Sequence, residues 1–104
     1  MDNFKVIYRI LRYLEKAMDY EEPDLDFISH KKLGISEPRW IAIMEMLAKE
    51  RYIDGVSIKR SADGEMVVSV SDLRITLKGL EYLSENSLMQ KASNLAKGIA
   101  EYIP

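Results

Sequence analysis

The sequence has no cysteine and only one histidine among its 104 residues. The missing cysteines exclude disulfides, thiolate metal ligands and cysteine nucleophiles. A single histidine leaves no second imidazole with which to build a transition-metal site. No apolar run is long enough to span a bilayer, and the N-terminus lacks the apolar core of a secretory leader. We therefore expect a cytoplasmic protein that holds no metal and no other cofactor and does not contact a membrane.

The chain also lacks an excess of positive charge. Its 15 basic and 17 acidic residues give a formal net charge of −2, whereas proteins that grip nucleic-acid phosphates are usually basic on at least one face. Catalytic motifs are missing too, since there is no Gly-x-Ser-x-Gly elbow and no glycine-rich phosphate loop. We expect a binding protein rather than an enzyme. Residues 1–104 form one domain in this interpretation, because a chain of this length supports one core.

Apolar residues recur at intervals of three and four over Asn3–Met18, along two neighbouring stripes. This spacing predicts a helix that is apolar on two sides and therefore central to the fold. The next segment, residues 19–26, contains five carboxylates, no basic residue and one proline. Such a composition predicts an exposed loop.

A helix-turn-helix is predicted after this loop. Asp26 is a candidate N-cap for a short helix, and Gly34 can supply its left-handed stop. Ser36 is the expected N-cap of a longer helix that runs to about Arg51, with Pro38 in its first turn, where a missing N–H costs nothing. The inner side of this helix is expected to carry Trp40, Ile43, Met44 and Leu47.

The composition then changes to strand-like alternation at 56–60 and 66–71, on either side of an Asp63-Gly64 pair that favours tight reversal. A β-hairpin is predicted here. Thr76 is the expected cap of a further helix carrying Leu77, Leu80 and Leu83, and Ser87 opens a capping-box pattern for a last one. The order of elements predicts an α+β, mainly helical fold, a winged helix-turn-helix with a two-stranded wing and extra C-terminal helices.

Several stretches of the chain carry a family likeness. They are Phe4–Tyr8, Leu14–Met18, Leu33–Glu37 with Trp40, Ser57–Gly64 and, most tellingly, Ile75–Ser87. In these stretches the sequence resembles the YjcQ family, small proteins of Gram-positive bacteria and their prophages, over nearly the whole chain. The resemblance implies a winged-helix fold and carries no activity over to this chain. The run Ile75–Leu83 is also similar to the segment that follows the wing in many bacterial winged-helix regulators, where its role is structural.

One functional hypothesis is weak binding of double-stranded DNA by a transcriptional regulator, since winged helices that read DNA place the third helix in the major groove. The candidate contacts are Lys31, Lys32, Arg39, Lys49, Lys59 and Arg60. However, acidic and basic residues balance in each reading element: three of each over 36–51, two of each over 24–33, and two of each over 56–71. Because phosphate affinity depends on uncompensated cations, we expect it to be low.

The alternative hypothesis is a protein-interaction module of the same fold that does not bind DNA and meets a host protein instead. The acidic loop and the balanced third helix favour it. The last helix carries an apolar stripe at 88, 92, 95, 99 and 102. This stripe can pack on the first helix or on a twin helix, so a monomer and a homodimer both stay open.

Overall fold

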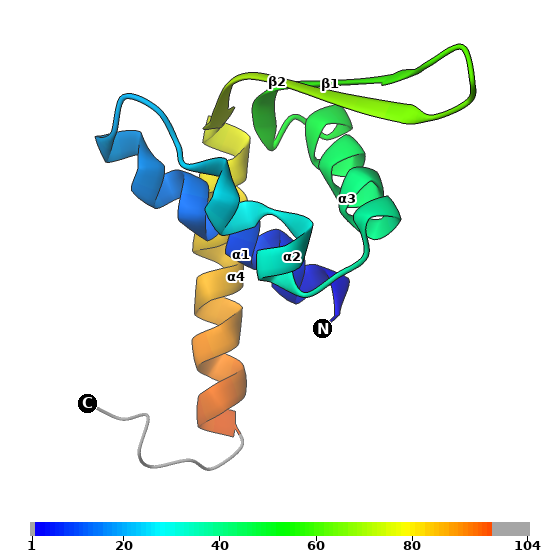
Figure 1. Cartoon of the computed structure of the whole chain (residues 1–104). Coiled ribbons are helices and arrows are strands. Elements are labelled where there is room, and N and C mark those ends of the chain that lie inside the picture. Colours follow the sequence, from blue (N-terminus) through cyan, green and yellow to red (C-terminus); the bar gives the residue numbers. More distant parts are fainter. Residues whose placement is uncertain (1, 97–104) are drawn as a thin grey trace.

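The structure is a computed structural model, which describes the backbone of residues 2–96 and the side chains of residues 2–86. Three helices, α1 (Asn3–Lys16), α2 (His30–Leu33) and α3 (Glu37–Lys49), precede a hairpin of β1 (Ile53–Arg60) and β2 (Met66–Ile75), and α4 (Leu77–Ala96) follows. The hairpin crosses one end of α3, and α4 runs down from the hairpin's base past α1 (Figure 1). This order confirms the mainly helical α+β fold expected of a winged helix.

Helix α1 is central, as its two apolar stripes predict, and it packs against α3 and β2 as well as α4. Its buried residues are Val6, Ile10, Leu11 and Leu14. The stripes extend less far than expected, because Phe4 and Met18 at their ends are 73% and 54% exposed. The helix ends in a 3-10 turn, η1 (Ala17–Asp19).

The segment between α1 and α3 corrects one prediction. Asp24, not Asp26, caps a first 3-10 turn, η2 (Leu25–Ile28), and Ser29 then caps the short helix α2. Two short elements replace the single helix expected here, since the Ser29 hydroxyl accepts a hydrogen bond from the Lys32 N–H and starts a new turn. The turn into α3 forms as expected: Gly34 adopts a left-handed conformation, with φ of 71°, and the Ser36 hydroxyl caps α3.

The hairpin is longer than the alternating pattern predicts. It gains Ile53 to Gly55 at the start of β1 and Asp72 to Ile75 at the end of β2. A bulge at Gly55 shifts the register between Asp54 and Val56, and the backbone there approaches the opposite strand closely. A Cβ on Gly55 would lie 2.5 Å from the Ser71 carbonyl oxygen, so only glycine fits this position.

Helix α4 corrects two more predictions. Thr76 caps it as expected, accepting a hydrogen bond from the Gly79 N–H at 3.1 Å. Leu77, however, is 73% exposed and lies outside the core. One continuous helix runs from Leu77 to Ala96, so the capping-box pattern at Ser87 does not begin a new helix. The predicted stripe that starts at residue 88 falls outside the described side chains.

The core lies between α1, α3 and the base of the hairpin, and it closes over Ile28 and Leu33 from the short elements. Trp40 is half-buried against this core, and its indole N–H donates a 2.8 Å hydrogen bond to the Ile28 carbonyl oxygen. That bond fixes α3 against the preceding segment. In the described part of the chain, no helix is long and apolar enough to cross a membrane.

Candidate functional site

The outward face of α3 lies under the wing and forms a groove with it. Ile43, Met44 and Leu47 face the core, and the helical period of 3.6 residues turns Pro38 and Glu45 away from it. The wing contributes Arg60 and its cross-strand partner Met66. The groove holds about 470 Å³, and its lining residues are Glu37, Pro38, Ile41, Ala42, Glu45, Arg60, Glu65 and Met66.

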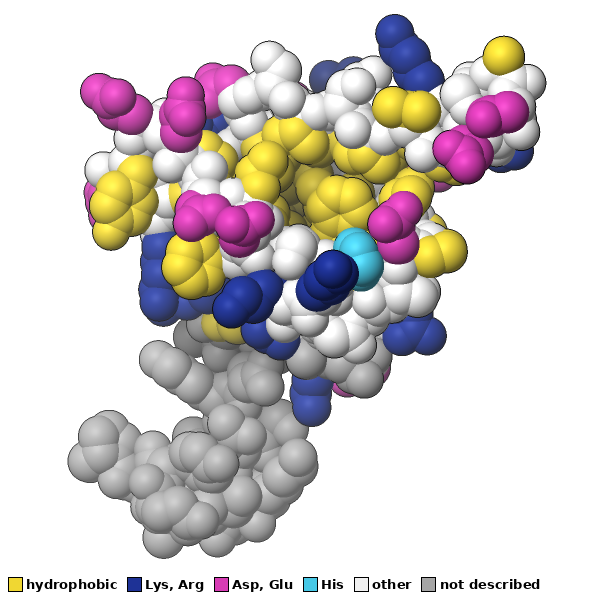
Figure 2. Space-filling model, in the orientation of Figure 1, with side chains coloured by type: hydrophobic (Ala, Val, Ile, Leu, Met, Phe, Trp, Pro, Cys, Tyr) yellow, Lys and Arg dark blue, Asp and Glu magenta, His cyan; other side chains and the backbone are white. Residues whose placement is uncertain are grey.

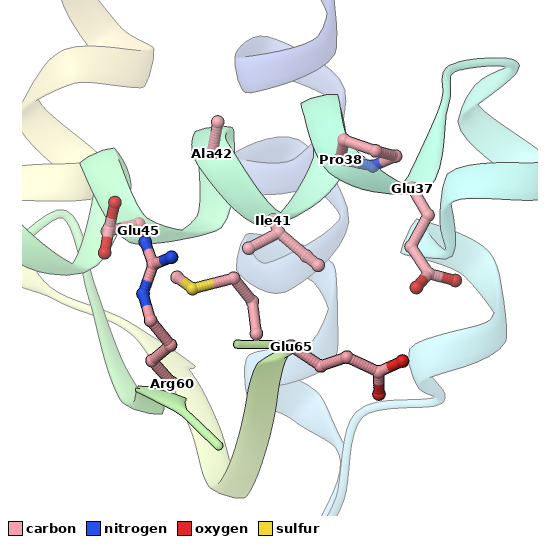
Figure 3. Close-up of a pocket in the computed structure, with 8 residues that line it drawn as sticks. Glu37, Pro38, Ile41, Ala42, Glu45, Arg60 and Glu65 are labelled. Atoms are coloured by element: carbon pink, nitrogen blue, oxygen red, sulfur yellow. The ribbon is translucent and has the colours of Figure 1, made fainter. Parts of the chain in front are cut away.

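The groove has an apolar floor and an acidic rim. Ile41 points from the helix toward the wing, while Arg60 points from the wing toward Glu45 (Figure 3). Glu37 and Glu65 lie at the other end of the groove (Figure 3). The lining therefore includes three carboxylates and one guanidinium, and the groove is acidic.

Two local interactions position the ends of this rim. His30 Nε2 lies 3.5 Å from Glu37 Oε2, which joins α2 to the first turn of α3. At the wing tip, the Ser61 hydroxyl and the Glu65 N–H both donate to the Asp63 carboxylate. These hydrogen bonds, the one from Ser61 above all, lower the pKa of Asp63 from its ordinary value. The wing tip thus holds a second stable negative charge beside Glu65.

The six cations proposed as DNA contacts are all exposed, and they are distributed over three elements. Lys31 and Lys32 lie on α2, Arg39 and Lys49 at opposite ends of α3, and Lys59 and Arg60 on β1. Strand alternation separates the last two, because Arg60 lines the groove with Met66 while Lys59 pairs with the exposed Val67 on the other face. Between Arg39 and Lys49, the outward face of α3 presents Ala42, Glu45 and Met46.

A basic stripe on α1 was missed by the sequence analysis. Its four members are all exposed and recur at helical intervals, which places them on one face opposite the core. They are Lys5, Arg9, Arg12 and Lys16. These four basic residues recur in the sequence at the spacing i, i+4, i+7 and i+11, which by itself predicts a basic face on this helix.

Two shallow grooves follow this basic stripe and share Tyr8 and Arg9. One holds about 650 Å³ and includes Phe4 and Tyr82. The other holds about 260 Å³ and includes Phe27. The Phe27 ring is 57% exposed and stacks on Tyr13 with 5.2 Å between ring centroids. Aromatic surface therefore accompanies the cations of α1.

The two signs of charge are unevenly distributed over the molecule. Acidic side chains lie over the wing tip and over the loop that follows α1, with an apolar hollow between them beneath the hairpin, while basic side chains lie along the lower edge and also on the wing (Figure 2). Among the residues whose side chains are described, no group of three His, Asp or Glu side chains could hold a metal ion.

Fold and site define a class of protein, the winged helix with a two-stranded wing, in which the groove beside the third helix is acidic and apolar. Within this class the chain belongs to the YjcQ family, since the family model described as "YjcQ protein" matches residues 8–102. Comparison with curated proteins and with solved structures gave no match. The family membership confirms the resemblance drawn from the sequence and assigns no function.

Proposed function

We propose that this protein is a protein-interaction module, and that the groove between α3 and the wing receives a cationic, apolar segment of a partner protein. The observation that carries the proposal is the lining of the groove, which combines three carboxylates, Glu37, Glu45 and Glu65, with the apolar side chains of Ile41 and Met66. An apolar floor favours burial of a partner's aliphatic side chains. The acidic rim favours lysine and arginine in the same segment and steers their approach.

The same lining disfavours double-stranded DNA as the partner. Nucleic-acid affinity depends on cations that neutralise phosphates, and only Arg60 among the eight lining residues is basic. Glu45 faces Arg60 and offsets its charge (Figure 3). A duplex that entered here would bring its phosphates toward Glu37 and Glu65 at the other end of the groove.

A peptide of alternating lysine and leucine tests the proposal, with a peptide of alternating glutamate and leucine as its counterpart. We expect the cationic peptide to shift the backbone amide NMR signals of α3 and of 60–66, and the acidic peptide to leave them unchanged. The double variant Glu37→Lys/Glu45→Lys should weaken binding of the cationic peptide at least about tenfold, because about 1.4 kcal/mol of attraction is lost. Glu81→Lys, an exposed position on α4 outside the groove, supplies the matched control.

A short duplex DNA added at low salt supplies the opposing arm. Shifts confined to α3 and the wing on adding DNA, and reduced by Arg39→Glu and Lys59→Glu, would favour the regulator hypothesis and contradict the proposal. Cationic-peptide binding that is equal in the wild type and in Glu37→Lys/Glu45→Lys would also contradict it.

A further inference from the structure

Residues 19–26, the acidic loop, run from the end of η1 into η2 and adjoin the C-terminal end of the basic stripe of α1. The acidic loop carries five exposed carboxylates, Asp19, Glu21, Glu22, Asp24 and Asp26. The contact zone is Phe27, whose ring stacks on Tyr13 and lines a groove with Arg12 and Lys16. A negative zone and a positive zone therefore adjoin each other on one surface, which we call the bipolar patch. Within it Arg12 is ion-paired with Glu15, and Glu21 and Glu22 line a further groove with Val70 and Leu73 of β2.

The negative zone is held in a defined position. Arg74 on β2 donates hydrogen bonds to the carbonyl oxygens of Ala17 and Tyr20, at 3.0 and 3.2 Å, and to that of Glu21. At the other end of the loop, the Asp24 N–H donates to the Tyr13 hydroxyl at 2.6 Å. A partner that docks here would meet preordered charges, which lowers the entropy cost of binding.

The bipolar patch also exposes large apolar side chains. Four of them lie within a ten-residue stretch, and their exposed fractions run from 39% to 67%. They are Met18, Tyr20, Leu25 and Phe27. Apolar surface this concentrated and rimmed by charges marks an interaction site more often than a solvated loop.

The presence of both positive and negative charge in the bipolar patch determines which partner is complementary to it. A two-fold interface brings a patch against its own copy, so a patch of one sign repels itself. In the bipolar patch, the acidic loop of each copy can lie on the basic stripe of the other, and the apolar side chains at the boundary are buried between them. An acidic partner would suit the stripe alone and leave the loop's five carboxylates against its own charges. A second copy supplies both signs of charge in the complementary order.

We propose that this protein forms a two-fold homodimer through the bipolar patch, which leaves the groove between α3 and the wing open on each protomer. The dimer has two identical sets of contacts between charges of opposite sign. Its stability should fall as salt concentration rises, because exposed ion pairs are screened. The inference is independent of the proposed groove partner, since the two surfaces share no residue.

Charge-reversal variants test the dimer by sedimentation velocity over a range of protein and salt concentrations. Arg12→Glu/Lys16→Glu cancels the charge of the basic stripe, and Glu21→Lys/Glu22→Lys reduces the charge of the acidic loop from −5 to −1. We expect each variant alone to dimerise at least about tenfold more weakly than the wild type, because both contacts lose most of their electrostatic attraction. An equimolar mixture should partly restore dimers, since one of its two contacts then joins an unchanged loop to an unchanged stripe.

Lys31→Glu/Lys32→Glu is the matched control, with the same charge change on α2, and it should dimerise like the wild type. Thermal unfolding of all variants checks that they are folded, which is expected because every changed side chain lies outside the core. A wild type that stays monomeric at the highest concentrations would overturn the proposal and assign the patch to a foreign partner. Variants that dimerise like the wild type, or a mixture that stays monomeric, would overturn it as well.

Discussion

The outward faces of α3 and α1 differ in a way that reverses the usual expectation for this fold. In a winged helix that reads DNA, the third helix and the wing carry the cations. Here the groove on that side is lined by Glu37, Glu45 and Glu65 with Arg60, whereas the outward face of α1 carries a stripe of four exposed cations. Both helices pack on the same core, and their solvent-facing residues give the two surfaces different charges. The comparison teaches that the fold fixes where a surface lies and that a few exposed charges decide what it can meet.

The largest expected effect concerns the contact between α4 and the base of the hairpin, which fixes the position of the wing relative to α1. Gly79 in α4 packs so closely on the base of the hairpin that an added Cβ would meet the Tyr52 carbonyl oxygen and lie 2.6 Å from Ile75 Cγ1. We expect Gly79→Ala to lower the free energy of unfolding by about 2–3 kcal/mol, because overpacking outweighs the better helix propensity of alanine. The melting temperature should fall by about 10 °C or more.

Ser84→Ala serves as the control for this change, because it adds no atom at an exposed position of the same helix. Its melting temperature should stay within a few degrees of the wild type. A Gly79→Ala protein as stable as the wild type would show that α4 can shift, and that the groove and α1 do not have a fixed arrangement.

A smaller effect is expected from the link between the acidic loop and the hairpin. Arg74→Leu removes hydrogen bonds to three carbonyl oxygens, including those of Ala17 and Tyr20. We expect urea unfolding to show a loss of about 2 kcal/mol, and the amides of 20–26 to exchange their hydrogens faster than in the wild type.

Lys59→Leu matches this substitution in charge and shape on the other strand of the hairpin. Its side chain is exposed, so it should change stability by only about 0.5 kcal/mol or less. Unchanged exchange in Arg74→Leu would mean that the negative zone is ordered by its own turns and not by the hairpin.

The smallest expected effect concerns the charge at the wing tip. Ser61→Ala removes the strongest hydrogen bond to the Asp63 carboxylate, so the pKa of Asp63 should rise toward its ordinary value of 3.8. An NMR titration of the side-chain carboxyl measures this shift, and Ser57→Ala on β1 is the control. Because the folded-state pKa is lowered, the stabilising contribution of this turn is present above the ordinary pKa and is lost as the pH falls through the lowered value. An unchanged pKa in Ser61→Ala would assign the shift to the Glu65 N–H.

Local sequence signals were sufficient to predict most of the helices, turns and strands of the fold. Gly34, Ser36 and Thr76 each perform the capping or stop role that their residue type predicts, because these roles depend on backbone geometry within one turn. The predictions that were wrong were also local. Asp24, and not Asp26, is the N-cap of η2. The capping-box pattern at Ser87 lies inside the continuous helix α4. A capping motif does not end a helix on its own when helical residues continue on both sides of it.

The candidate site was less accessible to sequence reasoning. The six cations are exposed and lie on α2, α3 and β1, the elements predicted at these positions, but the sequence does not show which acidic side chains lie beside them. The equal numbers of acidic and basic residues over 36–51 do not show which of these residues share a face of α3. Glu37 and Glu65 are 28 positions apart in the chain and meet only because the wing folds over α3.

By itself, the sequence determined the order of elements, the burial of α1 and the two-stranded wing, because apolar period, caps and turn residues act over a few neighbouring positions. It also determined that the total charge is close to neutral. Only the tertiary structure decided which carboxylates line the groove between α3 and the wing, and where that groove lies relative to the basic face of α1. Electrostatic fields depend on distances in space between side chains, and these distances are set by the packing of distant segments.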